Sequence, residues 1–477
     1  MLRKYLSDIA FMQVLNLLIK PIWILLIDRS VQNALSQEVY GNYFALFNFS
    51  LLFFIILDLG LNGFNSTQVA RDNKRIASLT GNILGLKMLL SIVYVLLIVV
   101  VGNIMGYSST EFGLLILLCI LQIITSFNQY LRTIVAALQR FKWDGVFMVL
   151  DRAVVIVLCA ILIWGGLDSF GLNISRFIWA QIIGVGLVFV LLIVFLFPHL
   201  RKIRISFNLN KILPLLRKSW PFALLVALMG MYNYLDGVML KTLASNKEAG
   251  VYALGYRLFY ALLMFAQIFS GVLLPFYSKN LQDRNVIQTI AKYTNKLLLC
   301  IGISVAFFCT AYAQEIMELL YPIKTSVNAE ISFSILMFGF IGSALVLVYG
   351  TLLTAGLRLK ELNITAFVTL TINLILNATL IPIYGAKGAA IATVFSQLLF
   401  GGVCYLLSVK KFKFLLAWVD FVKQGLAVIL LFLVIIVSKQ YLENAYVHLL
   451  MITLSVILAA YLYNLFERKH IKSLVRK

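Results

Sequence analysis

Long apolar segments separated by short polar breaks recur along the whole of this chain. A helix of about 20 residues crosses a hydrocarbon layer roughly 30 Å thick, and segments of that length account for most of the sequence. Of the 477 residues 62% are hydrophobic and only 12% are charged, which is more apolar surface than one water-soluble core could bury. The sequence therefore predicts an all-α polytopic membrane protein. The alternating strands of about ten residues that are typical of a membrane β-barrel are not seen.

About fourteen transmembrane helices can be placed. The predicted spans of the first half are residues 9–34, 39–61, 79–101, 112–135, 145–164 and 177–197. Those of the second half are residues 220–243, 251–276, 293–312, 326–354, 363–383 and 386–407, and two further spans at 421–437 and 446–465 follow. This pattern predicts two six-helix bundles, an N-terminal lobe at residues 1–210 and a C-terminal lobe at 211–409. Residues 410–477 would add two accessory helices, 13 and 14, and a basic cytosolic tail.

A phrase that occurs twice supports the division into related halves. Its first copy is Ile27-Asp28, Leu35-Ser36, Glu38 and Gly41-Asn42-Tyr43, and its second is Leu235-Asp236, Leu243-Ala244-Ser245, Glu248 and Gly250-Val251-Tyr252. In both copies an acid precedes a leucine by seven positions, and Gly-x-Tyr opens the next apolar segment. Pro21 and Pro221 stand in the leading span of each half and predict matching bends. Repeated bundles that enclose a central cavity are typical of secondary transporters.

The basic residues predict the orientation and the partners of the protein. Short loops rich in Lys and Arg stay in the cytosol, and most of the 40 basic residues fall on the side of the membrane that holds the N-terminus. Both termini are therefore predicted to be cytosolic. The net charge of +21 is spread over many membrane-flanking loops, which favours anionic membrane lipids over nucleic acid as the partner.

Several classes of function lack the residues that they require. The sequence has no Walker-type glycine loop, and its polar stretches are too short to fold as a separate catalytic domain. The five cysteines lie in apolar spans without metal or redox spacing, and the three histidines are far apart. What remains is to move a molecule across the bilayer or to hold other proteins in it. We expect a transporter and not an enzyme, without catalytic residues, cofactor or metal site.

Ionisable residues within the apolar spans are the candidate site residues, because a charge at this depth is costly unless it faces protein or water. The predicted substrate-binding cations of the lumen are Lys20, Arg29, Lys87, Arg152 and Arg257. The acids, for ion coupling or for salt bridges, are Asp28, Asp58, Asp151 and Asp236, and the supporting polar residues are Asn16, Asn233, Tyr234 and Tyr256. A structural bridge between Asp236 and Arg257 and a cationic lumen for an anionic group both remain open.

Three motifs resemble those of a known family. The stretch from Leu235-Asp236 to Gly250-Val251-Tyr252-Ala253-Leu254-Gly255-Tyr256-Arg257-Leu258 resembles the signature of polysaccharide-biosynthesis, O-antigen-type flippases of the multidrug/oligosaccharidyl-lipid/polysaccharide (MOP) exporter superfamily. Leu57-Asp58-Leu59-Gly60-Leu61 and the stretch from Ile381-Pro382-Ile383-Tyr384-Gly385 to Ala392 resemble the same family. The resemblance implies a fold like that of the multidrug (MATE) branch and an alternating-access carrier. Such a carrier moves polyprenyl-diphosphate-linked oligosaccharide to the outer leaflet of the bacterial cytoplasmic (inner) membrane for O-antigen, capsule or exopolysaccharide assembly.

The resemblance further implies an ion gradient, of H+ or Na+, as the driving force, and glycan polymerase and chain-length proteins as candidate partners. Two alternatives remain open at this stage. One is an ion-coupled drug or small-molecule antiporter of the same superfamily, and the other is a membrane glycan polymerase or scaffold without transport. Drug sensitivity and loss of surface glycan after deletion of the gene would separate them.

Overall fold

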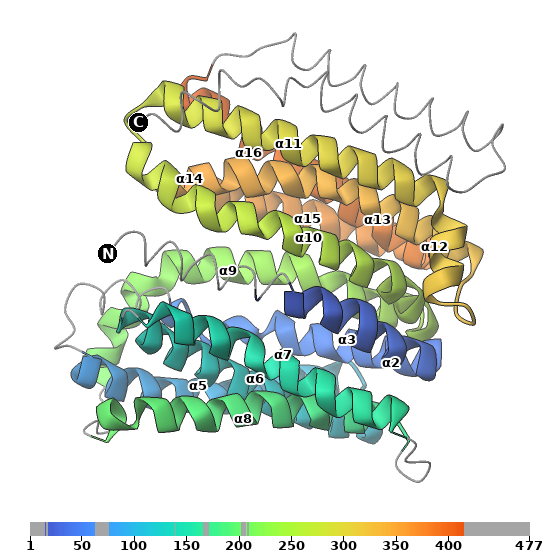
Figure 1. Ribbon diagram of the computed structural model, residues 1–477, viewed down its shortest axis with the longest axis horizontal. Helices are drawn as coiled ribbons and strands as arrows, with labels where there is room; N and C mark the ends of the chain where they lie inside the picture. Colours follow the sequence, from blue (N-terminus) through green and yellow to red (C-terminus); the bar gives the residue numbers. More distant parts are fainter. Residues whose placement is uncertain are drawn as a thin grey trace. The chain divides into compact units, whose positions relative to one another are not determined.

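The computed structural model describes residues 15, 18–62, 76–138, 140–165, 171–201, 207 and 209–414 (Figure 1). Among these residues, nine helices are long and apolar enough to cross a membrane. The chain is therefore an all-α polytopic membrane protein, as its hydropathy predicts. The two C-terminal spans predicted at 421–437 and 446–465, and the basic tail, lie outside the described residues.

The chain divides into two compact units, Met1–Ala253 and Leu254–Lys477. The first unit contains η1 (Trp23–Asp28), α2 (Arg29–Ala34), α3 (Gln37–Leu52), η2 (Phe54–Leu57), α5 (Ile76–Ile104), α6 (Ser109–Ala137), α7 (Phe141–Trp164), α8 (Ile174–Leu200) and α9 (Leu209–Leu243). The boundary falls within α10 (Asn246–Asn280). The second unit continues with α11 (Arg284–Ala311), α12 (Ala313–Leu320), α13 (Val327–Leu345), η5 (Val346–Gly350), α14 (Thr351–Ala355), α15 (Leu359–Tyr384) and α16 (Ala386–Phe412). Every span predicted before residue 410 overlaps one or more of these helical segments.

The repeated phrase starts a helix in the same way in both copies. Ser36 is the N-cap of α3, where its Oγ accepts a hydrogen bond from the backbone N–H of Val39 at 3.2 Å. Ser245 precedes α10, and its Oγ accepts from the backbone N–H of Glu248 at 3.1 Å. A serine at this position satisfies one of the amide groups that a helix leaves unpaired at its start. The duplication in sequence is therefore also a duplication in local structure.

The long helices present one face to lipid and the other to protein. On α5 the side chains of Ile92, Leu96 and Val100, four residues apart, are 60%, 60% and 56% exposed. Tyr94 and Ile98, on the opposite face, are buried. A helix that is apolar on both its buried and its exposed face is stable in a bilayer, where the exposed stripe meets hydrocarbon.

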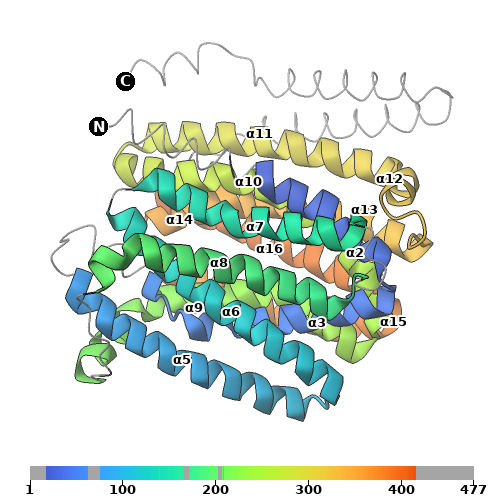
Figure 2. The same cartoon turned by 60° about the horizontal axis from the view of Figure 1, so that its bottom comes forward.

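Each unit has its own packed helices. In the first unit α6 packs against α8 and α3, and α7 packs against α8 (Figure 2). In the second unit α13 packs against α11 and α16, and α15 packs against α16. Helices α13 and α16 approach each other closely at Gly342 and Gly401, because a Cβ on either glycine would overlap backbone atoms of the facing helix. Small residues at helix crossings are the usual means of close packing in membranes.

Three of the predicted spans are interrupted. After α3 the chain forms the short 3-10 helix η2 and then a turn that contains Leu59 and Gly60, whose φ angles are 44° and 77°. Residues 18–22, which include Pro21, are followed by the π-helical turn η1, and η5 is a π-helical turn between α13 and α14. A change of hydrogen-bond pattern within a helix often marks a functional site.

Candidate functional site

Two of the predicted lumen cations come together beside the π-helical turn of the first unit. Lys20 is half-buried one turn before η1, and it is subject to the charges of Arg152 and Asp151 on α7. The Arg152 guanidinium lies 5.2 Å from the centre of the Trp23 ring, which stacks on Phe177 of α8 at 5.8 Å. A cation over an aromatic face is attracted by the ring, so Trp23 holds the guanidinium in place.

The Arg152 side chain keeps part of its surface accessible. Its exposed fraction is 35%, and its Nε lies 3.8 Å from Oδ2 of Asp151. By contrast, the neighbouring Arg132 is paired with Asp144, Nε to Oδ1, at 2.7 Å. The group of Lys20, Arg152 and Asp151 therefore carries one more positive than negative charge. A guanidinium and an ammonium in such a group are suited to bind a phosphate or carboxylate.

The acid of the first repeat is engaged by its own hairpin. Asp28 is buried at the end of η1, and its Oδ1 accepts a hydrogen bond from Tyr40 Oη at 2.9 Å. Its Oδ2 accepts from Gln32 Nε2 at 3.2 Å. Both carboxylate oxygens thus have donors, and the bond to Tyr40 joins the end of η1 to the start of α3.

The acid of the second repeat makes the corresponding contact. Asp236 on α9 is buried, and its Oδ2 accepts a hydrogen bond from Tyr252 Oη on α10 at 3.0 Å. In each copy, therefore, a carboxylate near the end of one helix accepts from a tyrosine near the start of the next. The tyrosines occupy different positions in the repeat, since Tyr252 corresponds in sequence to Tyr43 and not to Tyr40.

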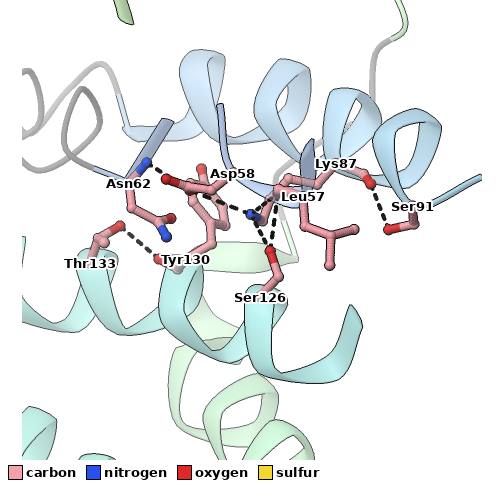
Figure 3. A network of polar contacts seen from close by, with 8 residues as sticks. All are labelled: Leu57, Asp58, Asn62, Lys87, Ser91, Ser126, Tyr130 and Thr133. Carbon is pink, nitrogen blue, oxygen red and sulfur yellow. Dashed lines mark hydrogen bonds and ion pairs between the residues drawn. The ribbon is translucent and has the colours of Figure 1, made fainter. Parts of the chain in front are cut away.

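Lys87 lies in a polar network at the break after α3 (Figure 3). Its side chain is 1% exposed, and its Nζ donates to the Leu57 carbonyl at 2.8 Å and to Ser126 Oγ at 2.7 Å. Asp58 Oδ1 lies 3.8 Å from the same nitrogen and accepts from the backbone N–H of Asn62 at 3.1 Å. Protein oxygens therefore surround this ammonium, and its role in binding substrate stays a prediction.

A further ion pair joins the two copies of the repeat to α6. Lys241, in the last turn of α9, pairs with Glu111 of α6 and donates to Asn42 Oδ1 of α3 at 2.6 Å. Its Nζ also lies 4.5 Å from the centre of the Tyr107 ring. Glu111 is fixed by a capping box with Ser108 at the start of α6. These residues are all in the first unit.

The remaining predicted residues are distributed over both units. Arg29 is half-buried at the start of α2, and Asn233 and Tyr234 lie on α9, the former exposed and the latter half-buried. Tyr256 and Arg257 are half-buried on the part of α10 that belongs to the second unit, where Tyr256 stacks on Tyr260 at 6.4 Å. Asn16 lies outside the described residues.

The sequence did not point to Gln32, Tyr40, Ser126, Lys241 or Glu111. Some of them had a usable signal: Gln32 follows Asp28 by four positions and so shares its helical face, and Ser108-x-x-Glu111 is a capping-box pattern. Ser126 and Tyr40 had none, because their importance depends on which helices pack together. Within the described ranges, no group of three His, Cys, Asp or Glu residues is arranged to hold a metal ion.

Comparison with known proteins agrees with this architecture. Residues 6–281, more than half of the chain, match the model of a family described as "Polysaccharide biosynthesis protein". A probable flippase, AglR of Haloferax volcanii, is 26% identical over 175 residues, which are 35% of this chain. The match spans 36%, little more than a third, of that relative's length.

Solved structures with the same fold are distant in sequence. The lipid II flippase MurJ, in an inward closed conformation, superimposes with a TM-score of 0.68 and 17% identity over 98% of this chain and 99% of its own. An inward-facing multidrug resistance MATE family transporter of the MOP superfamily gives a TM-score of 0.62 and 16% identity over 85% of this chain and 98% of its own. A MOP superfamily transporter from Pyrococcus furiosus gives a TM-score of 0.61 and 16% identity over 86% of this chain and 96% of its own. At these identities the likeness establishes the fold.

Proposed function

Because the chain belongs to the polysaccharide biosynthesis protein family, whose members are transporters and not enzymes, we propose that it carries a polyprenyl-diphosphate-linked oligosaccharide across the membrane. The direction is from the cytosolic to the outer leaflet of a bacterial inner membrane, and the translocated oligosaccharide is used to assemble O-antigen, capsule or another exopolysaccharide. A gradient of H+ or Na+ drives the cycle. Neither the sugars nor the diphosphate can cross hydrocarbon unaided, whereas the polyprenyl chain can remain in lipid.

The observation that carries this proposal is the grouping of Lys20 and Arg152 on a half-buried surface of the first unit. A diphosphate that leaves water needs donors to replace its hydration. The planar guanidinium of Arg152 can donate two parallel hydrogen bonds to phosphate oxygens, and the Lys20 ammonium adds a second charge. Trp23 restricts the guanidinium beforehand, which lowers the entropy lost when the anion binds.

The acids have a different part in the proposal. Asp28 and Asp236 tie each helix hairpin together through tyrosine, so protonation or ion binding at either would loosen the link between two helices. Such a link is suited to couple an ion gradient to a change of conformation. The cationic cavity between the halves of the sequence and the identity of the coupling ion stay predictions.

Deletion of the gene tests the proposed function against the two alternatives. We expect the lipid-linked repeat unit to accumulate on the cytosolic face of the membrane and surface glycan to be lost. A drug antiporter would instead leave surface glycan intact and raise drug sensitivity. A glycan polymerase or scaffold would leave repeat units on the outer face, because only their joining would fail.

A further inference from the structure

The interruption of the helix after α3 leaves the backbone carbonyl of Leu57 without its helical partner. In a continuous helix the Leu57 carbonyl would accept from the N–H of Leu61, but that N–H bonds to the Asp58 carbonyl at 2.8 Å. The Leu57 carbonyl accepts instead from Lys87 Nζ at 2.8 Å and from Ser126 Oγ at 3.0 Å. An unpaired carbonyl within the membrane is costly because no water is there to bond it, so the lysine and the serine make this break possible.

Three oxygens of different kinds converge on the Lys87 ammonium (Figure 3). They are the carbonyl of Leu57 at 2.8 Å, the hydroxyl of Ser126 at 2.7 Å and the carboxylate of Asp58 at 3.8 Å. The Tyr130 ring, 5.9 Å away, adds the face of an aromatic ring. Carbonyl ends of broken helices are the groups with which membrane transporters coordinate free coupling ions. Here the position of such an ion is taken by an ammonium on a side chain.

We propose that this cluster is a monovalent-cation site whose cation, the Lys87 ammonium, is covalently tethered to α5. The tether makes the break after α3 independent of free ions in the native protein. Removal of the side chain should convert the cluster into a site for a free cation of similar size and charge, an alkylammonium ion or K+. For either ion the protein oxygens can replace the water of hydration, as carbonyl oxygens do for K+ in potassium channels.

This inference is independent of the transported molecule. A plain salt bridge between Lys87 and Asp58 would not create a specific site when the lysine is removed, whereas a cation site would. The Ser126 hydroxyl and the Leu57 carbonyl distinguish the two cases, because neither would be needed by a simple charge pair.

Chemical rescue of Lys87→Ala tests the proposal. The full-length protein is purified in lipid nanodiscs, and its thermal unfolding is followed in propylammonium, potassium and sodium chloride, with choline chloride as the bulky reference at equal ionic strength. We expect Lys87→Ala to unfold at a lower temperature than wild type in choline. Propylammonium should restore at least half of the loss along a saturating curve, with a smaller gain from K+. Wild type and Lys247→Ala, which removes an exposed lysine of the same unit, should show no such dependence.

Two further variants keep the test decisive. Lys87→Ala combined with Asp58→Asn removes the carboxylate, and we expect its half-saturating propylammonium concentration to rise at least tenfold. Lys87→Met combined with Asp58→Asn should fold without any cation response. A folded Lys87→Ala protein with the same unfolding temperature in every salt would overturn the proposal. The proposal would also be overturned if Lys87→Ala did not fold in any of the salts while the Lys87→Met and Asp58→Asn double variant did fold.

Discussion

Arg152 is the side chain on which the proposed binding of a diphosphate depends most directly. Replacement by Gln removes the charge but keeps much of the volume, so we expect transport to fall about tenfold or more, since a hydrogen bond to a charged group contributes about 1.5–3 kcal/mol. Arg152→Lys should retain more activity than Arg152→Gln, because it keeps the charge. Transport of lipid-linked oligosaccharide at matched protein level is the measurement. Arg201→Gln, at an exposed arginine of the same unit, should transport like wild type, and equal loss in both would remove Arg152 from the site.

Asp28 and Asp236 are buried carboxylates, and each accepts a hydrogen bond from a tyrosine. We expect Tyr40→Phe and Tyr252→Phe each to lower stability by about 1–3 kcal/mol, because a buried carboxylate loses one of its hydrogen-bond donors. Thermal unfolding of the purified variants measures this. Tyr384→Phe, at a residue that is 53% exposed, is the control and should leave the unfolding temperature unchanged. If Tyr40→Phe and Tyr252→Phe unfold like wild type, the acids are held by other groups.

For individual residues, the sequence predicted which charges lie within the membrane but not the groups that they contact. Depth in an apolar segment identified Lys20, Lys87 and Arg152 as candidates, because a charge at depth is costly unless it faces protein or water. Which oxygen or ring each would meet depends on the rotation of its helix and on the packing of helices distant in sequence. For that reason Ser126, the hydrogen-bond partner of Lys87, could not be predicted.

Helices α3 and α10, which open the two copies of the repeat, cross at their first turns within the first unit. Gly41 lies against the backbone of Asn246, the first residue of α10, and Gly250 lies against Gln37, the first residue of α3. In each helix the glycine stands four positions after the start, so the contact is reciprocal. This reciprocity explains why the phrase contains a glycine in both copies.

Substitution of either glycine by alanine should force the two helices apart. The added Cβ would overlap a backbone oxygen in both cases, and we expect Gly41→Ala and Gly250→Ala to cost about 1–3 kcal/mol or more of stability. Gly113→Ala and Gly186→Ala are matched controls, because nothing lies within 4 Å of a Cβ at either helical position. They should be neutral or slightly stabilising, since alanine is the better helix former. Thermal unfolding that ranks all four alike would contradict the close crossing.

The helices themselves were largely predictable, and their interruptions were not. Length and hydropathy place the spans because the bilayer sets both. The predicted span at residues 39–61, however, contains most of α3, the 3-10 helix η2 and the turn at Leu59 and Gly60. Lys87 contacts Leu57 and Asp58 directly before this turn, and contacts between helices distant in sequence leave no periodic signal.

As a whole, the molecule combines an apolar exterior with a few fixed charges inside a helical unit. The exposed stripe of α5 suits lipid, while Lys20 and Arg152 offer an anion the donors that it loses on leaving water. The fold follows from hydropathy and repeat, and it is shared with MurJ and with MATE transporters. A flippase and a drug carrier of this fold differ in the chemistry of the surface that binds the substrate.

The most direct test is transport in a defined membrane. The purified protein is reconstituted into vesicles that contain polyprenyl-diphosphate-linked oligosaccharide, and a glycan-cleaving enzyme outside reports the fraction of sugar on the outer leaflet. The account predicts that wild type, under a proton or sodium gradient, exposes the pool that is protected in protein-free vesicles, and that Arg152→Gln exposes it about tenfold more slowly or less. A wild-type protein that leaves the protected pool unchanged under either gradient would contradict the central claim.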